Sequence, residues 1–237
     1  MYREQRISGR QLLKRVFFKT LPVLSGYIVL GIGFGILLQR SGYGIGWALA
    51  MSLLIYAGSM QFVGIGLLTS GASLLTAAVT TLMVNARHLF YGISMIERYK
   101  GAGRKKPYLI FALTDETYAL VSDGAVPDGA DPHLYRFLIS LFNHVYWVTG
   151  SLIGSILGAA LPFQTAGIEF SMTALFITVF VEQWLTSPDH RPALTGLLAS
   201  AGALLLFGPS DFLIPAMLLI TVMLTVLRGV LEKGGAA

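Results

Sequence analysis

Two long stretches without a charged residue dominate the first half of this chain. Residues 20–39 contain no charge, and neither do residues 41–86. About 20 apolar residues in an α-helix suffice to cross the hydrocarbon core of a bilayer. The first stretch therefore predicts one transmembrane span. The second is more than twice as long and predicts two spans, broken near the turn-forming residues 69–71.

The composition excludes a water-soluble domain of this size. Of the 237 residues, 54% are hydrophobic and 12% are charged, and the mean hydropathy is +0.69. Soluble domains carry about 25% charged residues, and half that share cannot cover a water-facing surface. The chain contains no cysteine, which removes disulfides, thiolate metal sites and cysteine nucleophiles together.

The second half of the chain repeats the pattern of apolar runs. Residues 108–121 are apolar apart from two carboxylates and too short for an easy span, and 122–132 is an acidic, turn-rich loop. Four further apolar runs follow, at 137–160, 170–185, 193–207 and 212–227. We therefore predict an all-α, polytopic transmembrane helix bundle of about seven spans plus one short or re-entrant segment. It would form a single transmembrane domain over residues 1–237.

A faint internal repeat accompanies this pattern. Shifting the sequence by 122 residues aligns residues 56–62 with residues 178–184, and the first span with residues 142–161. Membrane proteins that move solutes are often built from such repeats. Apolar sequences also align by chance, so the repeat is a hypothesis.

Basic residues gather in two clusters that adjoin apolar runs. Six of the 17 Lys and Arg lie in residues 1–19, and five lie in residues 98–106. Such clusters are typical of segments that flank a membrane and contact anionic headgroups, rather than of a nucleic-acid surface. By the positive-inside tendency, the N-terminal segment is cytoplasmic. Three full crossings would then place the 98–106 loop outside. Either this loop is an exception, or one of the first three segments is re-entrant.

Glycines in two of the apolar runs indicate close helix packing. They occupy every second position over residues 31–35 and every fourth position over residues 150–158. Small residues at such spacing let helix backbones approach one another. The pattern predicts packing contacts and does not identify a substrate.

The first candidate site residues lie at the end of the third apolar run. Polar groups inside membrane spans are costly, and they often line pathways. On a continuous helix, Asn85 and His88 share one face, and Arg87 points away from it. Two interpretations stay open: a snorkelling Arg87 with capping neighbours, or a broken helix whose polar end faces a substrate. We favour the second.

The next candidates are two adjacent carboxylates in the short segment, Asp115 and Glu116. Neighbours in a helix diverge by about 100°, so one can face a cavity while the other caps or pairs. The alternative is an amphipathic interfacial helix with both groups in water. A carboxyl group in a low-dielectric cavity favours its neutral form and can cycle a proton. We predict that Asp115 carries the proton and that Glu116 is a local cap or ion-pair partner.

A run of small residues at 57–59 precedes Gln61 and can interrupt a helix. Unwound backbone together with an amide can bind the ammonium and carboxylate of an amino acid, so Ser59 and Gln61 are candidate binding residues. Close helix packing explains the small residues equally well. Asn143 and His144 are better explained by packing, with a single interhelical hydrogen bond from Asn143.

Motifs for enzymes are largely missing. The chain has no HExxH, G-x-S-x-G or P-loop sequence. Ser59 with His88 would suit a hydrolytic pair, but nothing in the sequence brings the two together. We expect a protein that is not an enzyme, with no cofactor and no metal site.

Three blocks of sequence contain these candidates and are specific in combination. The blocks are Gly58-Ser59-Met60-Gln61-Phe62, Asn85-Ala86-Arg87-His88-Leu89-Phe90-Tyr91-Gly92 and Thr114-Asp115-Glu116-Thr117-Tyr118. In content, order and spacing they resemble the AzlC family. The resemblance covers residues 15–160 well and the remainder by hydropathy.

The resemblance implies a multi-pass permease of the bacterial inner (plasma) membrane, the large subunit of a branched-chain amino acid exporter. Its substrates would be valine, leucine, isoleucine and in some members methionine. It would work with a second, small membrane subunit of the AzlD type. We expect the substrate to be bound by Ser59, Gln61, Asn85, Arg87 and His88, and proton coupling to involve Asp115 and Glu116. The alternatives from other classes are an intramembrane hydrolase and a non-transporting membrane subunit that scaffolds a partner.

Overall fold

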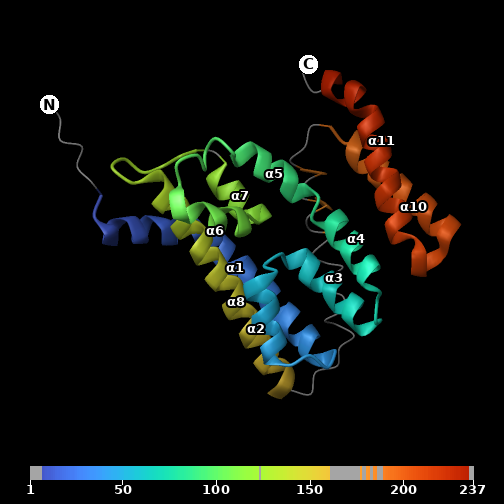
Figure 1. Cartoon of the computed structure of the whole chain (residues 1–237), viewed down its shortest axis with the longest axis horizontal. Helices are drawn as coiled ribbons and strands as arrows, with labels where there is room; N and C mark the ends of the chain where they lie inside the picture. Colours follow the sequence, from blue (N-terminus) through green and yellow to red (C-terminus); the bar gives the residue numbers. More distant parts are fainter. Residues whose placement is uncertain are drawn as a thin grey trace. The chain divides into compact units, whose positions relative to one another are not determined.

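The computed structural model describes residues 7–122, 124–160, 177, 180, 181, 184, 185 and 189–234, and every regular element in this part of the chain is a helix (Figure 1). The helices are α1 (Gly9–Arg40), α2 (Ile45–Leu54), α3 (Gly58–Thr69), α4 (Leu74–Val84), α5 (Arg87–Met95), the 3₁₀ turn η1 (Gly103–Lys105), α6 (Lys106–Phe111), α7 (Asp115–Val121), α8 (Pro132–Ala160), α10 (Arg191–Asp211) and α11 (Leu213–Gly234). The predicted all-α class is confirmed. The helices belong to two compact units: the first contains α1–α3 and α5–α8, the second contains α10 and α11, and α4 contributes to both.

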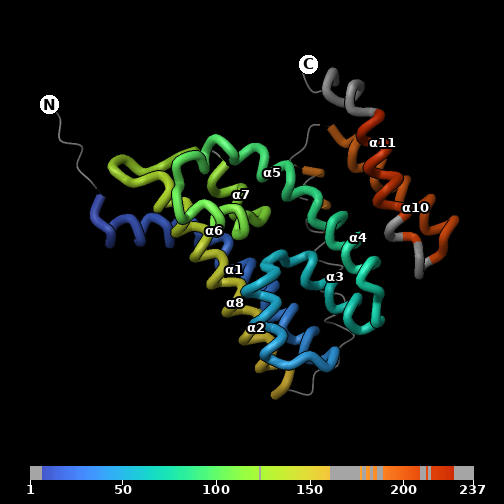
Figure 2. Tube along the Cα trace, viewed as in Figure 1, coloured from blue at the N-terminus to red at the C-terminus, as the bar shows by residue number. Residues whose placement is uncertain are grey.

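The first unit is built around α1 and α8, which lie side by side along much of their length (Figure 2). They contain 32 and 29 residues, or about 48 and 44 Å of helix at 1.5 Å per residue. Both exceed the ~30 Å hydrocarbon core of a bilayer, and both are apolar enough to cross it. They contain the spans predicted at 20–39 and 137–160.

Contact between the backbones of α1 and α8 depends on glycine. A Cβ atom added to Gly31 would lie 2.9 Å from the backbone nitrogen of Ser151. At Gly35 and Gly154 the partner backbone comes closer still. Any larger residue at these positions would force the helices apart. The predicted packing role of the glycine runs is therefore confirmed.

The stretch 41–86 folds differently from the two spans predicted for it. It forms three short helices, α2, α3 and α4, of 10, 12 and 11 residues. The predicted break at 69–71 is confirmed, because α3 ends at Thr69 and Gly71 has a φ of 63°. The prediction was wrong in missing a second break, at 55–57, which separates α2 from α3.

This additional break centres on Tyr56. Its φ of 44° lies in the left-handed region and is the only such value for a non-glycine residue in the part of the chain that the structure describes. The Tyr56 ring stacks on the imidazole of His144 in α8, with 4.1 Å between the ring centroids. Burying an aromatic ring offsets a strained backbone. Because Tyr56 and His144 are far apart in the sequence, no local sequence pattern predicts this contact.

The short segment 108–121 is interrupted as well. α6 ends at Phe111, and α7 begins after Thr114, whose hydroxyl accepts a 3.3 Å hydrogen bond from the Thr117 amide. A side-chain cap of this kind stabilises the start of a helix. The two pieces have 6 and 7 residues, so the segment is too short to form a span, as predicted.

In the second unit, α10 and α11 pack against each other. Gly208 inside α10 has φ 72° and ψ 172°, a conformation that glycine adopts without strain, and it kinks the helix. Between the apolar runs predicted at 193–207 and 212–227, the structure thus has a kink within α10, and α11 starts at Leu213.

Three helices of the described chain are long and apolar enough to cross a membrane: α1, α8 and α10 over residues 191–208. The predicted count of seven spans is not confirmed, because α2, α3, α4 and the apolar stretch 215–226 of α11 are shorter than a bilayer-crossing helix. The span predicted at 170–185 lies mostly outside the described residues. Part of the repeat segment 178–184 does too, so the repeat stays a prediction.

The basic cluster at 98–106 has structural partners within the first unit. The Arg98 guanidinium donates hydrogen bonds to the carbonyl oxygens of Val121, at 3.2 Å, and Ser122, at the end of α7. A cation there satisfies carbonyls that lack a partner inside the helix. Lys105 lies 3.7 Å from Asp131. Part of the cluster thus supports helix ends. The two alternatives for this loop, an exception to the positive-inside tendency or a re-entrant segment before it, stay open.

Replacing Gly35 with alanine should destabilise the protein, because the new methyl group meets the carbonyl oxygen of Ser151. Overpacking of this kind costs about 1–3 kcal/mol. Gly26→Ala is the matched control on the same helix, since no neighbouring atom lies within 4 Å of its Cβ position. Thermal unfolding of the purified variants in detergent measures the difference. Equal midpoints for the two variants would contradict backbone contact between α1 and α8.

Candidate functional site

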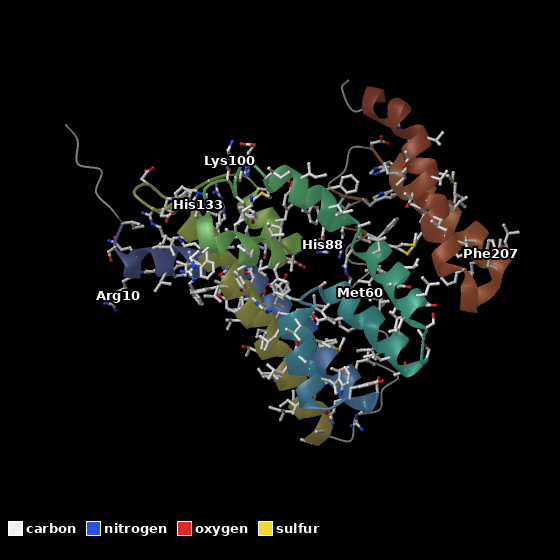
Figure 3. The ribbon with its side chains drawn as sticks, in the orientation of Figure 1. Arg10, Met60, His88, Lys100, His133 and Phe207 are labelled. Carbon is white, nitrogen blue, oxygen red and sulfur yellow. The ribbon has the colours of Figure 1, made fainter. Side chains whose placement is uncertain are left out.

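Arg87 joins three interrupted stretches of the first unit. It is the first residue of α5. Its Nη1 lies 2.8 Å from Oδ2 of Asp115, and its Nη2 donates a 2.8 Å hydrogen bond to Oγ of Ser59. Asp115 is the first residue of α7 and Ser59 the second residue of α3. Met60 and His88, which follow Ser59 and Arg87 in sequence, lie in the same part of the view in Figure 3.

The backbone before Arg87 departs from a regular α-helix. The amides of His88 and Leu89 bond to the carbonyls of Asn85 and Ala86 at 2.9 and 3.1 Å, the spacing of a 3₁₀ turn. The break that the second interpretation of this block requires is therefore present. Arg87, expected to point away from its polar neighbours, makes the long-range contacts. Nδ1 of His88 lies 3.2 Å from the carbonyl oxygen of Asn85.

The ion pair between Arg87 and Asp115 is partly exposed and has unused hydrogen-bonding capacity. Each side chain is 36% exposed. Nε of Arg87, Oδ1 of Asp115 and Oδ1 of Asn85 have no hydrogen-bond partner in the described structure. Ion pairs with this much exposure contribute about 0–1 kcal/mol. A ligand that supplies both charges can therefore open the pair at little cost.

Gln61 is fixed inside the protein. It is fully buried. Its Oε1 accepts a 2.8 Å hydrogen bond from Nε1 of Trp147 in α8, and its Nε2 donates a 3.4 Å bond to Oγ of Ser52 in α2. These partners tie α3 to α2 and α8. The structure brings Ser59 to Arg87 but directs Gln61 elsewhere.

Glu116 lies beside the ion pair but takes no part in it. Its Oε2 accepts a 2.7 Å hydrogen bond from the hydroxyl of Tyr27 in α1, while much of the side chain is exposed. Of the two roles expected of Glu116, local cap or ion-pair partner, the ion pair is made by Asp115 instead. Adjacent helix residues diverge by about 100°, and here that divergence sends Asp115 toward α5 and Glu116 toward α1.

A row of hydroxyl groups leads from Glu116 into the interior. The Tyr27 oxygen lies 2.7 Å from Oγ1 of Thr114, which lies 3.0 Å from Oγ1 of Thr117. Nδ2 of Asn143 in α8 donates a 3.0 Å hydrogen bond to the Thr117 oxygen. Tyr27, Thr114, Thr117 and Asn143 are all buried, and we call these four residues the hydroxyl chain. The interhelical hydrogen bond predicted for Asn143 is confirmed.

Sequence reasoning missed Tyr27, Thr114 and Thr117. Thr114 lies immediately before the acidic first turn of α7, and Thr117 lies within that turn. In the sequence this pattern indicates only the start of a helix. Tyr27 sits in a glycine-rich span with no polar neighbour to draw attention to it. The satisfied packing role predicted for His144 is confirmed, since its ring nitrogens lie 3.0 Å from the Tyr108 hydroxyl and 3.0 Å from the Ser52 carbonyl oxygen.

The sequence has clear relatives among known proteins. The profile of the AzlC protein family matches residues 22–161. The chain is 46% identical over 220 residues to the branched-chain amino acid transport protein AzlC of Bacillus subtilis, covering 93% of this chain and 87% of that protein. It is 44% identical over 219 residues to an uncharacterized membrane protein of Helicobacter pylori, covering 92% and 96%. It is 30% identical over 207 residues to the inner membrane protein YgaZ of Escherichia coli, covering 84% and 82%. No solved structure matches it significantly.

The family match contains the whole of the site. Residues 22–161 include Arg87 with its partners, Glu116 and every member of the hydroxyl chain. The named relatives are membrane proteins, and the long apolar helices of this chain agree with several crossings of a bilayer. The chain is a multi-pass membrane protein and belongs to the AzlC family.

Proposed function

We propose that this chain exports branched-chain amino acids across the bacterial inner membrane, as the large subunit of a two-component secondary transporter. The Bacillus subtilis relative carries the name of a branched-chain amino acid transport protein, and the Escherichia coli relative that of an inner membrane protein. The observation that carries the proposal is the partly exposed Arg87–Asp115 ion pair at the meeting point of three interrupted helices.

A zwitterionic amino acid carries the same two charges as this ion pair. Its carboxylate fits the Arg87 guanidinium, which binds carboxylates through two parallel hydrogen bonds. Its ammonium fits Asp115, whose Oδ1 is unused, with Oδ1 of Asn85 as a further acceptor. Each charge of the ligand then replaces a charge of the protein. No ion is left unpaired away from water, which would be costly.

The interrupted helices support the same binding mode. α3 and α5, of 12 and 9 residues, begin next to Ser59 and at Arg87. The helix dipole makes such N-termini favourable for a carboxylate. Many transporters bind their substrates at broken helices of this kind. The apolar side chain of the substrate, that of valine, leucine, isoleucine or methionine, is proposed from the family.

The geometry gives no support to an intramembrane hydrolase. Ser59 would need a base beside its hydroxyl, but that hydroxyl accepts a hydrogen bond from Arg87, which holds its proton throughout the physiological range. His88 is turned to the Asn85 carbonyl. A non-transporting scaffold subunit is the remaining alternative, and transport measurements distinguish it.

Full export should require a small subunit of the AzlD type. Large apolar side chains are exposed along α1, among them Leu13, Phe17, Phe18, Leu21 and Val29, and another membrane helix could cover such a surface. The measurement is leucine efflux from vesicles that contain this chain alone, both subunits or no protein. Little efflux is expected with the chain alone. Full activity from the chain alone would defeat the two-component proposal.

Recognition of both charges predicts which compounds compete with leucine. In a counterflow assay on vesicles, leucine should compete, whereas leucinamide, which lacks the carboxylate, and 4-methylpentanoate, which lacks the ammonium, should not. Arg87→Lys should weaken leucine competition about tenfold, equal to ~1.4 kcal/mol, because one ammonium cannot replace the planar, multiply bonded guanidinium.

Arg104→Lys is the matched control, because Arg104 is an exposed cation of the same unit away from the site. It should compete as the unaltered protein does. If Arg87→Lys also behaves as the unaltered protein, Arg87 only anchors the helix at the membrane interface and the binding proposal fails.

A further inference from the structure

The hydroxyl chain ends at an oxygen that has no partner. Asn143 is fully buried, and its Nδ2 donates to Thr117, yet its Oδ1 accepts no hydrogen bond in the described structure. A buried amide oxygen without a donor is unfavourable and calls for an explanation. The amide could rotate by half a turn and exchange its two ends, because oxygen and nitrogen are nearly equal in size.

The hydrogens in the chain can be counted. Three oxygen–oxygen contacts link Glu116 to Tyr27, Tyr27 to Thr114, and Thr114 to Thr117. Each contact holds one hydrogen. If Tyr27 donated to Glu116 while Thr114 donated to Thr117, the 2.7 Å contact between Tyr27 and Thr114 would hold none. Hydroxyl hydrogens rotate to suit their partners, so the whole chain runs in one direction or the other.

The direction depends on the charge of Glu116. When Glu116 is ionised, Tyr27 donates to it, Thr114 donates to Tyr27, and Thr117 donates to Thr114, which reverses the Thr114-to-Thr117 direction seen in the structure. The Thr117 oxygen then accepts from Nδ2 of Asn143, as observed. Three hydroxyl hydrogens fill the three contacts, and no hydrogen is left over.

When Glu116 is protonated, every bond in the chain reverses. Glu116 donates to Tyr27, Tyr27 donates to Thr114, and Thr114 donates to Thr117. The hydroxyl hydrogen of Thr117 is now free and needs an acceptor, which Nδ2 of Asn143 cannot be. Half a turn of the amide presents Oδ1 instead. The unpartnered oxygen of Asn143 is therefore an acceptor that the second state of the chain can use; the buried Tyr56 hydroxyl, which lies beside Tyr27 and Thr117 and is itself unpartnered, is another.

We propose that Glu116 is the carboxylate that gains and loses the transported proton, and that the hydroxyl chain, ending in the reversible amide of Asn143, satisfies its hydrogen bonds in both states. This inference rests on the proposed transport function for its biological meaning. Glu116 takes up one proton and later releases it, while the hydroxyl and amide hydrogens only rotate. Asp115 is less suited, because its carboxylate is already engaged in the ion pair with Arg87.

The surroundings of Glu116 offer no competing ion pair. The titratable and charged groups that face it are Tyr27 of α1, Tyr56 before α3, Arg87 and Tyr91 of α5, and Asp115 of α7. Arg87 is engaged by Asp115, and no described cation pairs with the Glu116 carboxylate. Two residues of α8 lie on this side. The neutral Asn143 is the last member of the hydroxyl chain, and His144 contacts Tyr56 and Tyr108.

Infrared difference spectroscopy tests the inference without any transport. The purified protein in lipid is titrated with acid, and the carbonyl band of a protonated carboxyl group is followed. Because the chain has 12 Asp and Glu, several carboxyl groups contribute to this band; one component should be missing in Glu116→Gln and present in Asp115→Asn. Tyr27→Phe removes the donor that stabilises the ionised form, so the band should appear at a pH about one unit higher. Tyr108→Phe, a tyrosine bonded to His144 outside the chain, should leave the titration unchanged.

The rotation of Asn143 has its own signature. The difference spectrum should contain a side-chain amide band that disappears in Asn143→Leu, because Oδ1 gains a donor only in the protonated state. A carboxyl band unchanged by Glu116→Gln, or a Glu116 component that is lost in Asp115→Asn, would overturn the proposal. So would a Tyr27→Phe titration identical to that of the unaltered protein.

Transport measurements then separate this inference from the proposed function. In vesicles, Glu116→Gln should lose leucine accumulation driven by a pH gradient but retain measurable leucine counterflow, whereas Asp115→Asn should lose both. A Glu116→Gln variant that responds fully to the gradient would contradict the inference alone. Absence of counterflow in the unaltered two-subunit protein would contradict the proposed function, while the infrared result would still decide the protonation of Glu116.

Discussion

Close contact between the backbones of α1 and α8 is the constraint on which the rest of the first unit depends. The helix face that carries the glycines also carries the interior polar residues: Tyr27 lies one turn before Gly31, and Trp147 one turn before Ser151. Residues four apart share a helix face. The approach that glycine permits therefore brings these polar groups within reach of α3 and α7. Both short helices are held by hydrogen bonds to this pair, through Gln61 and Trp147 in one case and Thr117 and Asn143 in the other.

The two neighbouring carboxylates of α7 divide the chemistry of the site under the proposed function. Asp115 faces Arg87 and would receive the ammonium of the substrate, while Glu116 faces α1 and the hydroxyl chain. The two charges are adjacent, so each acts on what the other binds. When Glu116 is ionised, its negative charge strengthens the attraction for the substrate ammonium. When Glu116 is protonated, that contribution is lost. Proton and amino acid then oppose each other's binding, and the opposition is reciprocal. That sign suits exchange of one for the other.

The sequence predicted the features that depend on local composition. Uncharged apolar runs predicted helices and a location in a membrane, and the glycine spacing predicted close helix packing of the kind seen between α1 and α8. Polar residues are so few in these runs that Ser59, Arg87 and Asp115, which the structure brings together, could be chosen without it. Their pairing could not be predicted, because it depends on how the interrupted helices are oriented. Tyr27 escaped notice for the same reason, since only the folded chain sets α1 against α7. The expected helix across residues 55–57 was wrong because a tertiary contact at Tyr56 overrode the helical pattern.

The interruption between α2 and α3 has a further consequence for the covalent chain itself. Residues 45–69 contain no proline, so no covalent feature prevents them from forming one continuous helix. At 1.5 Å per residue such a helix would be about 37 Å long, enough to cross a bilayer. What divides it is the left-handed backbone of Tyr56 followed by the extended backbone of Ala57, and the Tyr56 ring packs against His144 and Phe111. A proline break is set by the covalent chain, whereas this break is set by contacts that form only when the chain folds. The division of this apolar stretch into two short helices is therefore a tertiary property and not a covalent one.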